Sequence, residues 1–289
     1  MMKAFKKLTF AFNALLIAIA ILISNPVNAA NFTSITVIGD SLFDGGNEET
    51  AVISAYKLWG NGDGFTAKPG YYKFKYCNGY TGAEYFAYYM GMYDKTHFFN
   101  YAVAGLSSIE LPQVLTKIYE KNIILDPKGL FVIFVGAHDV FQSKISRDQS
   151  AENIKNAVAD LYSHGARYFM VMNLPLMGDF PNYNALAAAD INAANVAYKS
   201  INFALAEKLN NLSYAKSIVQ FDTANFSSLI NQYAYSVGFT NIKNACYTNT
   251  AVCNTPKAYI YWDDVHFTDT TNSYFGSFMQ SKLLEANLP

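Results

Sequence analysis

The chain has 289 residues, of which 52% are hydrophobic and 15% are charged, and its formal net charge is −1. This composition allows a large buried core and excludes a disordered or collagen-like chain. The charge also argues against a nucleic-acid-binding protein, because such proteins usually carry a basic excess. The sequence contains no internal repeat, low-complexity tract or linker, which favours a single domain.

The first 29 residues have the pattern of a secretory signal peptide. Three lysines precede an apolar stretch over residues 8–23, and the small residues Val27 and Ala29 suit cleavage after Ala29 or one residue later. The apolar stretch is shorter than the ~20 residues that span a bilayer comfortably, which favours cleavage over an uncleaved anchor. We therefore expect residues 1–29 to be removed and residues 30–289 to form one secreted or periplasmic domain.

Short apolar segments alternate with longer helical patterns along the rest of the chain. The predicted strands are rich in β-branched or aromatic residues and end at or near Gly, Asn or Asp. They cover residues 34–38, 97–101, 130–135, 168–173 and 217–221. The predicted helices cover residues 81–90, 109–121, 151–163 and 185–209. This alternation predicts a three-layer α/β/α fold with a five-stranded parallel sheet covered on both faces.

Ligand sites in such sheets lie at the carboxyl ends of the strands. Ser41, Gly105 and Gly136 each follow closely on a predicted strand, so we expect them to gather at one edge of the sheet. Two stretches interrupt the alternation. Residues 56–80 are rich in Gly, Tyr and Lys and are predicted to form a long loop over the mouth of the site. Residues 225–257 are polar and hold two of the three cysteines.

Export permits disulfide bonds. Cys246 and Cys253 bracket a short polar segment and are predicted to pair, which leaves Cys77 as a buried small residue. The bridge would lie just before Asp263 and His266, where it could position or occlude that segment. Three cysteines without a second cluster do not indicate a structural zinc site.

A serine near the start of the domain and an Asp-x-x-His segment near its end supply the groups of a serine-hydrolase triad. Ser41 lies in a glycine-bounded turn after the first predicted strand. A serine hydroxyl becomes a good nucleophile when an imidazole takes its proton, and that imidazole needs an acceptor to hold its tautomer. We therefore predict Ser41, His266 and Asp263 as the catalytic residues of an ester hydrolase that needs no metal or cofactor. Asp264 is the alternative orienting acid.

The position of Ser41 differs from the Gly-x-Ser-x-Gly elbow of α/β-hydrolases, which lies mid-chain. The motif order instead resembles the GDSL, or SGNH, hydrolase family. Further blocks in the family's order carry this resemblance, which covers essentially residues 33–277: Asp-Gly-Gly-Asn at 44–47, Tyr-Cys-Asn-Gly at 76–79, Glu-Tyr-Phe-Ala at 84–87, Asn-Tyr-Ala-Val-Ala-Gly at 100–105 and Val-Gly-Ala-His-Asp at 135–139. The resemblance implies a flavodoxin-like sheet and an oxyanion hole built from the backbone N–H groups of Ser41 and Gly105.

The chain departs from the family pattern at His138, where the family carries an asparagine whose amide helps to bind the oxyanion. A neutral imidazole can donate one N–H, although its reach and tautomer differ from those of an amide. We predict that His138 contributes to the oxyanion hole. The alternative is that His138 packs beneath the site and leaves the oxyanion to the backbone donors.

The blocks look most like those of the bacterial secreted branch that includes lysophospholipases A, phospholipases A and glycerophospholipid–cholesterol acyltransferases. The predicted partner is therefore a lipid ester, and exposed aromatic residues between Tyr71 and Tyr93 could contact acyl chains or, transiently, a membrane surface. A carbohydrate or short-chain acetyl esterase is the enzymatic alternative. A non-catalytic lipid- or glycan-binding protein is the alternative from a different class, and the intact Ser41, Asp263 and His266 argue against it.

Overall fold

The computed structural model describes residues 32–46, 70–73, 75–121, 124–142, 145–248, 251–286 and 288. The predicted signal segment and most of the predicted loop over residues 56–80 lie outside these ranges. All five predicted strands are present, and they form one parallel sheet in the order β2-β1-β3-β4-β5. The strands are β1 (Ser34–Gly39), β2 (Phe98–Asn100), β3 (Gly129–Phe134), β4 (Tyr168–Met172) and β5 (Ile218–Phe221).

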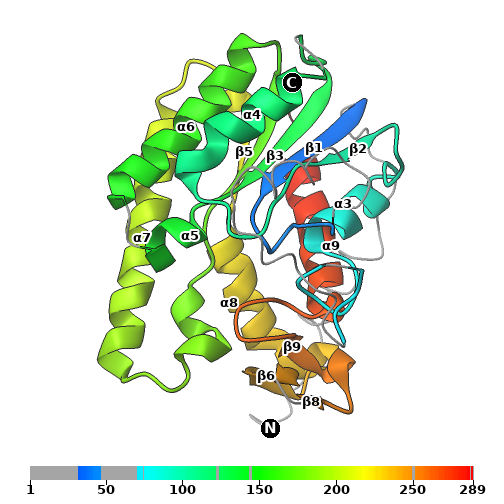
Figure 1. The fold of residues 1–289 in the computed structure, drawn as a ribbon, viewed down its shortest axis with the longest axis vertical. Coiled ribbons are helices and arrows are strands. Elements are labelled where there is room, and N and C mark those ends of the chain that lie inside the picture. The colour runs from blue at the N-terminus through cyan, green and yellow to red at the C-terminus, as the bar shows by residue number, and fades with distance from the viewer. Residues whose placement is uncertain are drawn as a thin grey trace, which may run out of the picture.

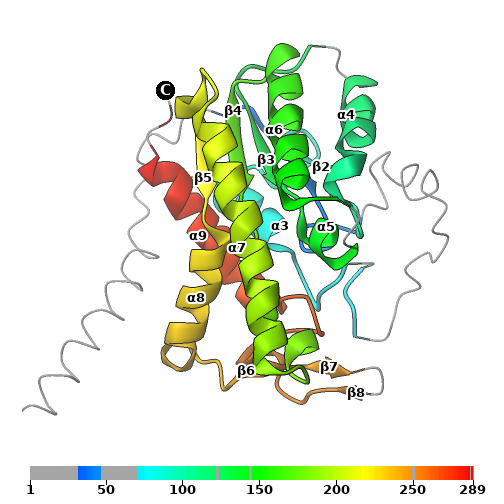
Figure 2. The same cartoon turned by 90° about the vertical axis from the view of Figure 1, so that its left-hand side faces the viewer.

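Helices cover both faces of this sheet, which confirms the predicted three-layer α/β/α fold (Figures 1 and 2). One face packs against α3 (Gly82–Tyr89), α8 (Thr223–Tyr233) and α9 (Asp269–Glu285). The other packs against α4 (Leu111–Tyr119), α6 (Arg147–Ser163) and the C-terminal half of α7 (Ala188–Asn210). The strand order is that of flavodoxin-like folds, in which the chain reverses direction across the sheet between β1 and β3.

Strand β3 shows why the sheet is buried on both sides. Its side chains point alternately to opposite faces. Leu130, Val132 and Phe134 therefore join the core beneath α9, whereas Phe131 and Ile133 join the core beneath α6. Both faces of this central strand are apolar, as is typical of parallel sheets covered by helices.

Helix α6 begins four residues earlier than the hydrophobic pattern predicts, because Ser146 caps it by accepting a hydrogen bond from the backbone N–H of Gln149. The predicted pattern for α4 begins with a short 3₁₀ turn, η1 (Ser108–Glu110). Three helices were not expected from the sequence: α5 (Ala137–Gln142), α8 and α9.

The predicted irregular stretch after β5 holds part of α8 and small strands at one end of the molecule, below α7 and α8 in Figure 2. There β6 (Asn241–Ala245) pairs with β9 (Tyr259–Tyr261), and β7 (Tyr247–Thr248) pairs with β8 (Ala251–Val252). The remaining 3₁₀ turns are η2 (Met177–Asp179), η3 (Pro181–Tyr183), η4 (Ala215–Ser217), η5 (Ala234–Val237) and η6 (Pro256–Ala258). Within the described ranges no helix has both the length and the apolar character needed to cross a membrane.

Candidate active site

Two segments far apart in the sequence meet at the carboxyl edge of the sheet. Ser41 lies in the turn that follows β1, an inner strand of the sheet. Asp263 and His266 lie in the loop between β9 and α9, which is closed at its base by a hydrogen bond from the Trp262 N–H to the His266 carbonyl. This hydrogen bond holds the shape of the loop independently of any contact with Ser41.

The side chains of Ser41, His266 and Asp263 form a continuous hydrogen-bonded chain. The Ser41 hydroxyl lies 2.8 Å from Nε2 of His266, and Nδ1 of His266 lies 2.7 and 2.8 Å from the two carboxylate oxygens of Asp263. The geometry assigns the tautomer: Nδ1–H donates to the carboxylate, and Nε2 accepts from the serine. Asp264, the alternative acid, is exposed and makes no hydrogen bond to His266 among the described residues.

The Asp263 side chain is 14% exposed, and both of its carboxylate oxygens accept hydrogen bonds. Oδ1 accepts the backbone N–H groups of Val265 and His266, each at 2.9 Å, and Oδ2 accepts the Tyr71 hydroxyl at 2.7 Å. Burial by itself would raise the pKa of Asp263, but the charge and hydrogen bond of His266, together with the other donors, lower the pKa below its ordinary value. The group therefore stays ionised beside the imidazole.

The predicted oxyanion donors also lie at this edge. Gly105 follows β2 with φ of +84°, a conformation that favours glycine, and a side chain there would meet no atom of the described residues within 4 Å. Within the described part of the chain, the N–H groups of Ser41 and Gly105 donate to no protein acceptor. These two donors therefore remain available for a ligand oxygen.

Buried polar side chains hold the loops of the site together. Asp44 accepts the N–H groups of Gly46 and Ala104, which ties the serine turn to the residue before Gly105. Burial raises the pKa of Asp44 to about 6, against the effect of these two backbone donors. Asn100 makes a second tie, because its amide donates to the Phe43 carbonyl at 2.8 Å.

Asp139 ties the loops after β2 and β3 in the same way, since it accepts the Ser108 N–H and the Ser150 hydroxyl. The sequence blocks contain Asp44, Asn100 and Asp139, but sequence reasoning gave them no role. Their buried acceptor positions are visible only in the folded chain.

His138 lies on the first turn of α5, half-buried, with its ring 5.9 Å from that of Phe141. Gly136, the third glycine expected at this edge, precedes α5 with φ of +126°. Burial raises the pKa of Asp40, next to Ser41, and the charges of His138 and His266 act against this increase. His138 is therefore close enough to the serine turn to affect its electrostatics. Among the described residues no hydrogen bond fixes the imidazole, so its part in an oxyanion hole stays a prediction.

Tyr71 and Tyr76 also contact the Asp–His pair. Tyr76 begins one of the blocks that carry the family resemblance, but neither tyrosine was assigned a role from the sequence. The Tyr71 hydroxyl binds Asp263, and the Tyr76 ring lies 5.1 Å from the His266 ring. Both belong to the stretch predicted as a loop, in which many residues are aromatic. Nothing in the local pattern distinguishes Tyr71 from its aromatic neighbours.

Cys246 and Cys253 form the expected disulfide bond, which closes the β7–β8 hairpin. Cys77 is buried and free, and burial raises the pKa of its thiol to about 12, so this thiol is unreactive near neutral pH. Among the described residues no group of three or more His, Cys, Asp or Glu side chains could hold a metal ion.

Comparison with known proteins identifies relatives of the chain. A GDSL esterase/lipase of Arabidopsis thaliana is 24% identical over 186 residues, which cover 57% of this chain and 51% of that protein, so the chain spans about half its length. GDSL esterase/lipase 6 of the same plant is 23% identical over 330 aligned positions, which cover 89% of each protein. The structure of the YxiM protein of Bacillus subtilis matches with a TM-score of 0.51 at 15% identity, covering 88% of this chain and 56% of that chain.

The structural likeness at this low identity shows the fold alone. The sequence evidence goes further, because the model of the family described as GDSL-like lipase/acylhydrolase matches residues 35–279, well over half of the chain. Members of this family and the curated relatives are esterases and lipases. The chain belongs to the GDSL-like lipase/acylhydrolase family and is a carboxylic ester hydrolase.

Proposed function

We propose that the protein is a secreted serine hydrolase that cleaves acyl esters of phospholipids or lysophospholipids, with Ser41, His266 and Asp263 as its catalytic triad. The observation that carries the triad is the continuous chain of hydrogen bonds, 2.8 Å from Ser41 to His266 and 2.7 Å from His266 to Asp263. Each member lies within the reach that proton transfer and tautomer control require.

In the proposed reaction, Nε2 of His266 takes the proton of Ser41 while the serine oxygen attacks the ester carbonyl. Asp263 stabilises the imidazolium that forms. The N–H groups of Ser41 and Gly105 bind the oxyanion of the tetrahedral intermediate, a contact that strengthens as charge develops on the oxygen. His266 then protonates the leaving alcohol. Water, or an acceptor alcohol in a transferase reaction, releases the acyl group from Ser41.

Exposed apolar side chains that follow closely in the chain on the predicted oxyanion residues Gly105 and His138 support a lipid substrate. Ile109 follows the loop of Gly105 and is 47% exposed, and Phe141 lies one helical turn after His138 and is 39% exposed. Burial of such groups against an acyl chain or a lipid surface is favourable because it removes apolar area from water. The proposed export rests on the pattern of residues 1–29, and the Cys246–Cys253 bond suits an oxidising compartment.

The test compares wild-type protein with Ser41→Ala on three substrates: dioleoyl phosphatidylcholine vesicles, lysophosphatidylcholine micelles and acetylated xylan. Mass spectrometry of released acids should find fatty acid from either lipid, released by the wild type alone and unaffected by EDTA. Acetate from xylan without fatty acid from the lipids would identify the carbohydrate esterase alternative. A fluorophosphonate probe should label Ser41, and a non-catalytic binding protein would not be labelled.

A further inference from the structure

Residues 70–73 and 75–80, here called the strap, cross the Asp263–His266 loop and contact both of its catalytic side chains. The Tyr71 hydroxyl donates to Oδ2 of Asp263 at 2.7 Å. The Tyr76 ring lies 5.1 Å from the His266 ring at an angle of 37°. A segment 192 positions away in the sequence from Asp263 therefore supplies the long-range donor to this carboxylate.

The strap is fixed at its first residues by aromatic packing. The Tyr71 ring makes edge contacts with the rings of Tyr247 and Trp262, at 4.8 and 5.7 Å between centroids. Gly70 has φ of +94°, and a Cβ atom there would approach Val252 to 2.9 Å. The Tyr71 ring is thus held between the disulfide-closed hairpin and the residue that precedes Asp263.

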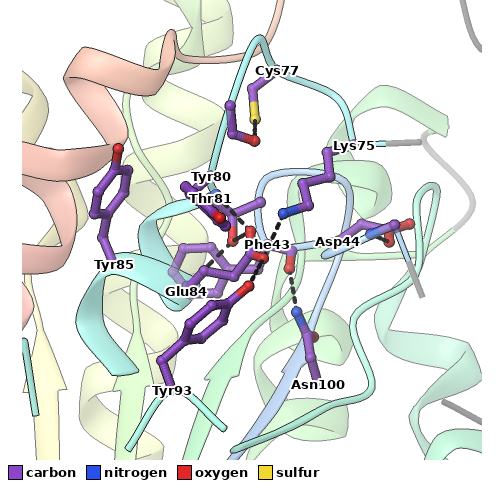
Figure 3. A network of polar contacts seen from close by, with 12 residues as sticks. Phe43, Asp44, Lys75, Cys77, Tyr80, Thr81, Glu84, Tyr85, Tyr93 and Asn100 are labelled. Carbon is purple, nitrogen blue, oxygen red and sulfur yellow. Dashed lines mark hydrogen bonds and ion pairs between the residues drawn. The ribbon is translucent and has the colours of Figure 1, made fainter. Parts of the chain in front are cut away.

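The middle of the strap is fixed by a buried ion pair (Figure 3). Nζ of Lys75 lies 2.5 Å from Oε1 of Glu84 on α3, and both side chains are only 4% exposed. Glu84 also accepts the Tyr93 hydroxyl and the Thr81 N–H. A buried charge whose partner is removed carries a large desolvation cost, so the fold holds Lys75 strongly at this point.

The end of the strap is tied to the start of α9, directly after the catalytic loop. The Asn78 side chain accepts the Asp269 N–H, and the Asp269 carboxylate accepts the Tyr80 N–H, each at 2.8 Å. The strap is therefore fixed at Tyr71 itself, at Lys75 between the two residues that touch the triad, and again after Tyr76.

We propose that Tyr71 is a positioning residue for the reaction, and that the strap, anchored by Lys75 on Glu84, holds its hydroxyl on Asp263. This inference rests on the proposed function, since it acts through the Asp263–His266 pair. The N–H donors to Oδ1 of Asp263 come from within the same loop and accompany any rotation of that loop. The Tyr71 donor comes from another part of the fold, so it fixes the carboxylate relative to the rest of the site.

The charges around Asp263 agree with this role. His266 and Tyr71 are titratable groups that act on Asp263. Tyr247 and Asp264 act, together with Asp263, on Tyr71. Burial, and then the neighbouring Asp263 charge, raises the pKa of Tyr71 above its ordinary range, so the hydroxyl stays protonated and remains a donor. The Tyr71 hydrogen bond in turn helps to lower the pKa of Asp263.

The first experiment is Tyr71→Phe, which keeps the ring on Tyr247 and Trp262 and removes only the hydroxyl. With 4-nitrophenyl acetate as the probe, kcat should fall about tenfold, the factor that corresponds to one hydrogen bond to a charged group. KM should stay within about twofold. The low-pH limb of the kcat/KM profile should move to higher pH, because a carboxylate with one donor fewer stabilises the protonated, inactive form of the imidazole more strongly.

Tyr119→Phe is the matched control. The Tyr119 hydroxyl donates to Asp160 at 2.8 Å, and its ring stacks on His164 at 3.9 Å, at the C-terminal ends of α4 and α6. Those helix ends lie at the edge of the sheet opposite to Ser41, so the same atom is removed from the same type of pair without touching the site. Activity and pH profile should not change. Equal activities of Tyr71→Phe and wild type, or an equal loss in both variants, would overturn the proposal.

The anchor is tested by a double-mutant cycle with Lys75→Met, which keeps the apolar stem of the side chain. Lys75→Met should lower kcat, and Tyr71→Phe/Lys75→Met should lose no more kcat than the worse single variant, because both changes act on the same contact. Additive losses would show that Lys75 does not act through Tyr71. If Lys75→Met does not fold, Lys75→Met/Glu84→Gln replaces it in the cycle, since that variant leaves no unpaired buried charge.

The same experiments separate a failure of this inference from a failure of the proposed function. If the triad assignment is wrong, wild-type protein will not be labelled at Ser41 by a fluorophosphonate, and Ser41→Ala will keep its activity. If only the positioning role is wrong, wild type will be labelled and active, and Tyr71→Phe will match it in kcat and pH profile.

Discussion

The chain contains two Asp-x-x-His segments, Asp94–His97 and Asp263–His266, and both fold in the same way. In each, Oδ1 of the aspartate accepts the backbone N–H of the histidine, at 3.1 Å for His97 and 2.9 Å for His266. In each, Nδ1 of the histidine lies 2.7 Å from a carboxylate oxygen. The spacing itself therefore produces an oriented Asp–His pair, whether or not that pair has a function.

The two pairs differ in what the rest of the fold brings to them. The Asp94 and His97 side chains are 47% and 49% exposed, whereas those of Asp263 and His266 are 14% and 10% exposed. Asp263 accepts the Tyr71 hydroxyl, and His266 binds Ser41. Asp94 instead accepts the hydroxyl of Thr96, two residues along the chain. Hydrogen bonds from Thr96 and His97 lower the pKa of Asp94 too, so a lowered carboxyl pKa does not identify the site. Burial and long-range partners do.

The largest expected effect comes from removing the Ser41 hydroxyl, which binds the imidazole of the Asp263–His266 pair. Ser41→Ala should lower kcat/KM on 4-nitrophenyl acetate by at least about 10⁴-fold, because the nucleophile is lost. The melting temperature should stay within about 2 °C, since the hydroxyl is on a turn and fills little volume. Circular dichroism provides the folding control. Retained turnover with an unchanged far-UV spectrum would contradict the assignment.

The two aspartates should respond very differently to the same substitution. Asp263→Asn should lower kcat by about 10³–10⁴-fold, because an amide favours the wrong tautomer of His266. Asp94→Asn should leave kcat unchanged, since its pair meets no nucleophile. Asp264→Asn, measured in the same assay, should also have little effect. A larger loss in Asp264→Asn than in Asp263→Asn would show that the wrong acid was chosen.

The sheet could be predicted from the sequence because each strand is a short apolar run, which can be recognised without knowing the rest of the fold. The sequence pattern missed α9 because the buried face of that helix begins with polar residues of low helix propensity, Thr271 and Asn272, and only then continues with the apolar Phe275, Met279 and Leu283. That the three side chains of the proposed triad would lie together could be predicted, since each belongs to a short motif.

The contacts around the triad could not be predicted in the same way. Tyr71 and the Lys75–Glu84 pair depend on packing between segments that share no pattern, and Asp94–His97 has the catalytic spacing without a site. The local sequence therefore orients an Asp–His pair, and the fold determines which of the two pairs meets Ser41.

Substitution of His138 tests whether the site has a third oxyanion donor besides the N–H groups of Ser41 and Gly105. If the imidazole donates to the oxyanion, His138→Ala should lower kcat about 10²-fold, and His138→Asn should remain within about tenfold of wild type. KM should change little, because the contact is made in the transition state. If His138 only packs beneath the site, His138→Ala would lower the melting temperature and leave turnover per folded molecule unchanged.

The disulfide bond supports Asp263 indirectly, and Asp94 has no counterpart to it. Cys246→Ser/Cys253→Ser should lower the free energy of unfolding by about 2.5 kcal/mol, the loop-closure value for a short loop. The rate should fall a few-fold at most, because Tyr247 and Val252 still pack on the strap. Urea unfolding and mass spectrometry of the unreduced protein check this, and the latter should find Cys77 free. A bridge that includes Cys77 would contradict the pairing.

The smallest expected effect is the dependence of the free energy of unfolding on pH and salt. The folded-state pKa of Asp263 lies below its unfolded value, so its contribution to stability is complete above about pH 3.9 and is lost as the pH falls through the folded pKa. The difference in unfolding free energy between wild type and Asp263→Asn should therefore shrink as the pH falls below about 4. Sodium chloride at 1 M should leave that difference intact because the pair is buried, and should reduce any difference for Asp94→Asn because exposed charges are screened. Equal salt sensitivity of the two variants would show that burial does not protect the Asp263–His266 pair from screening.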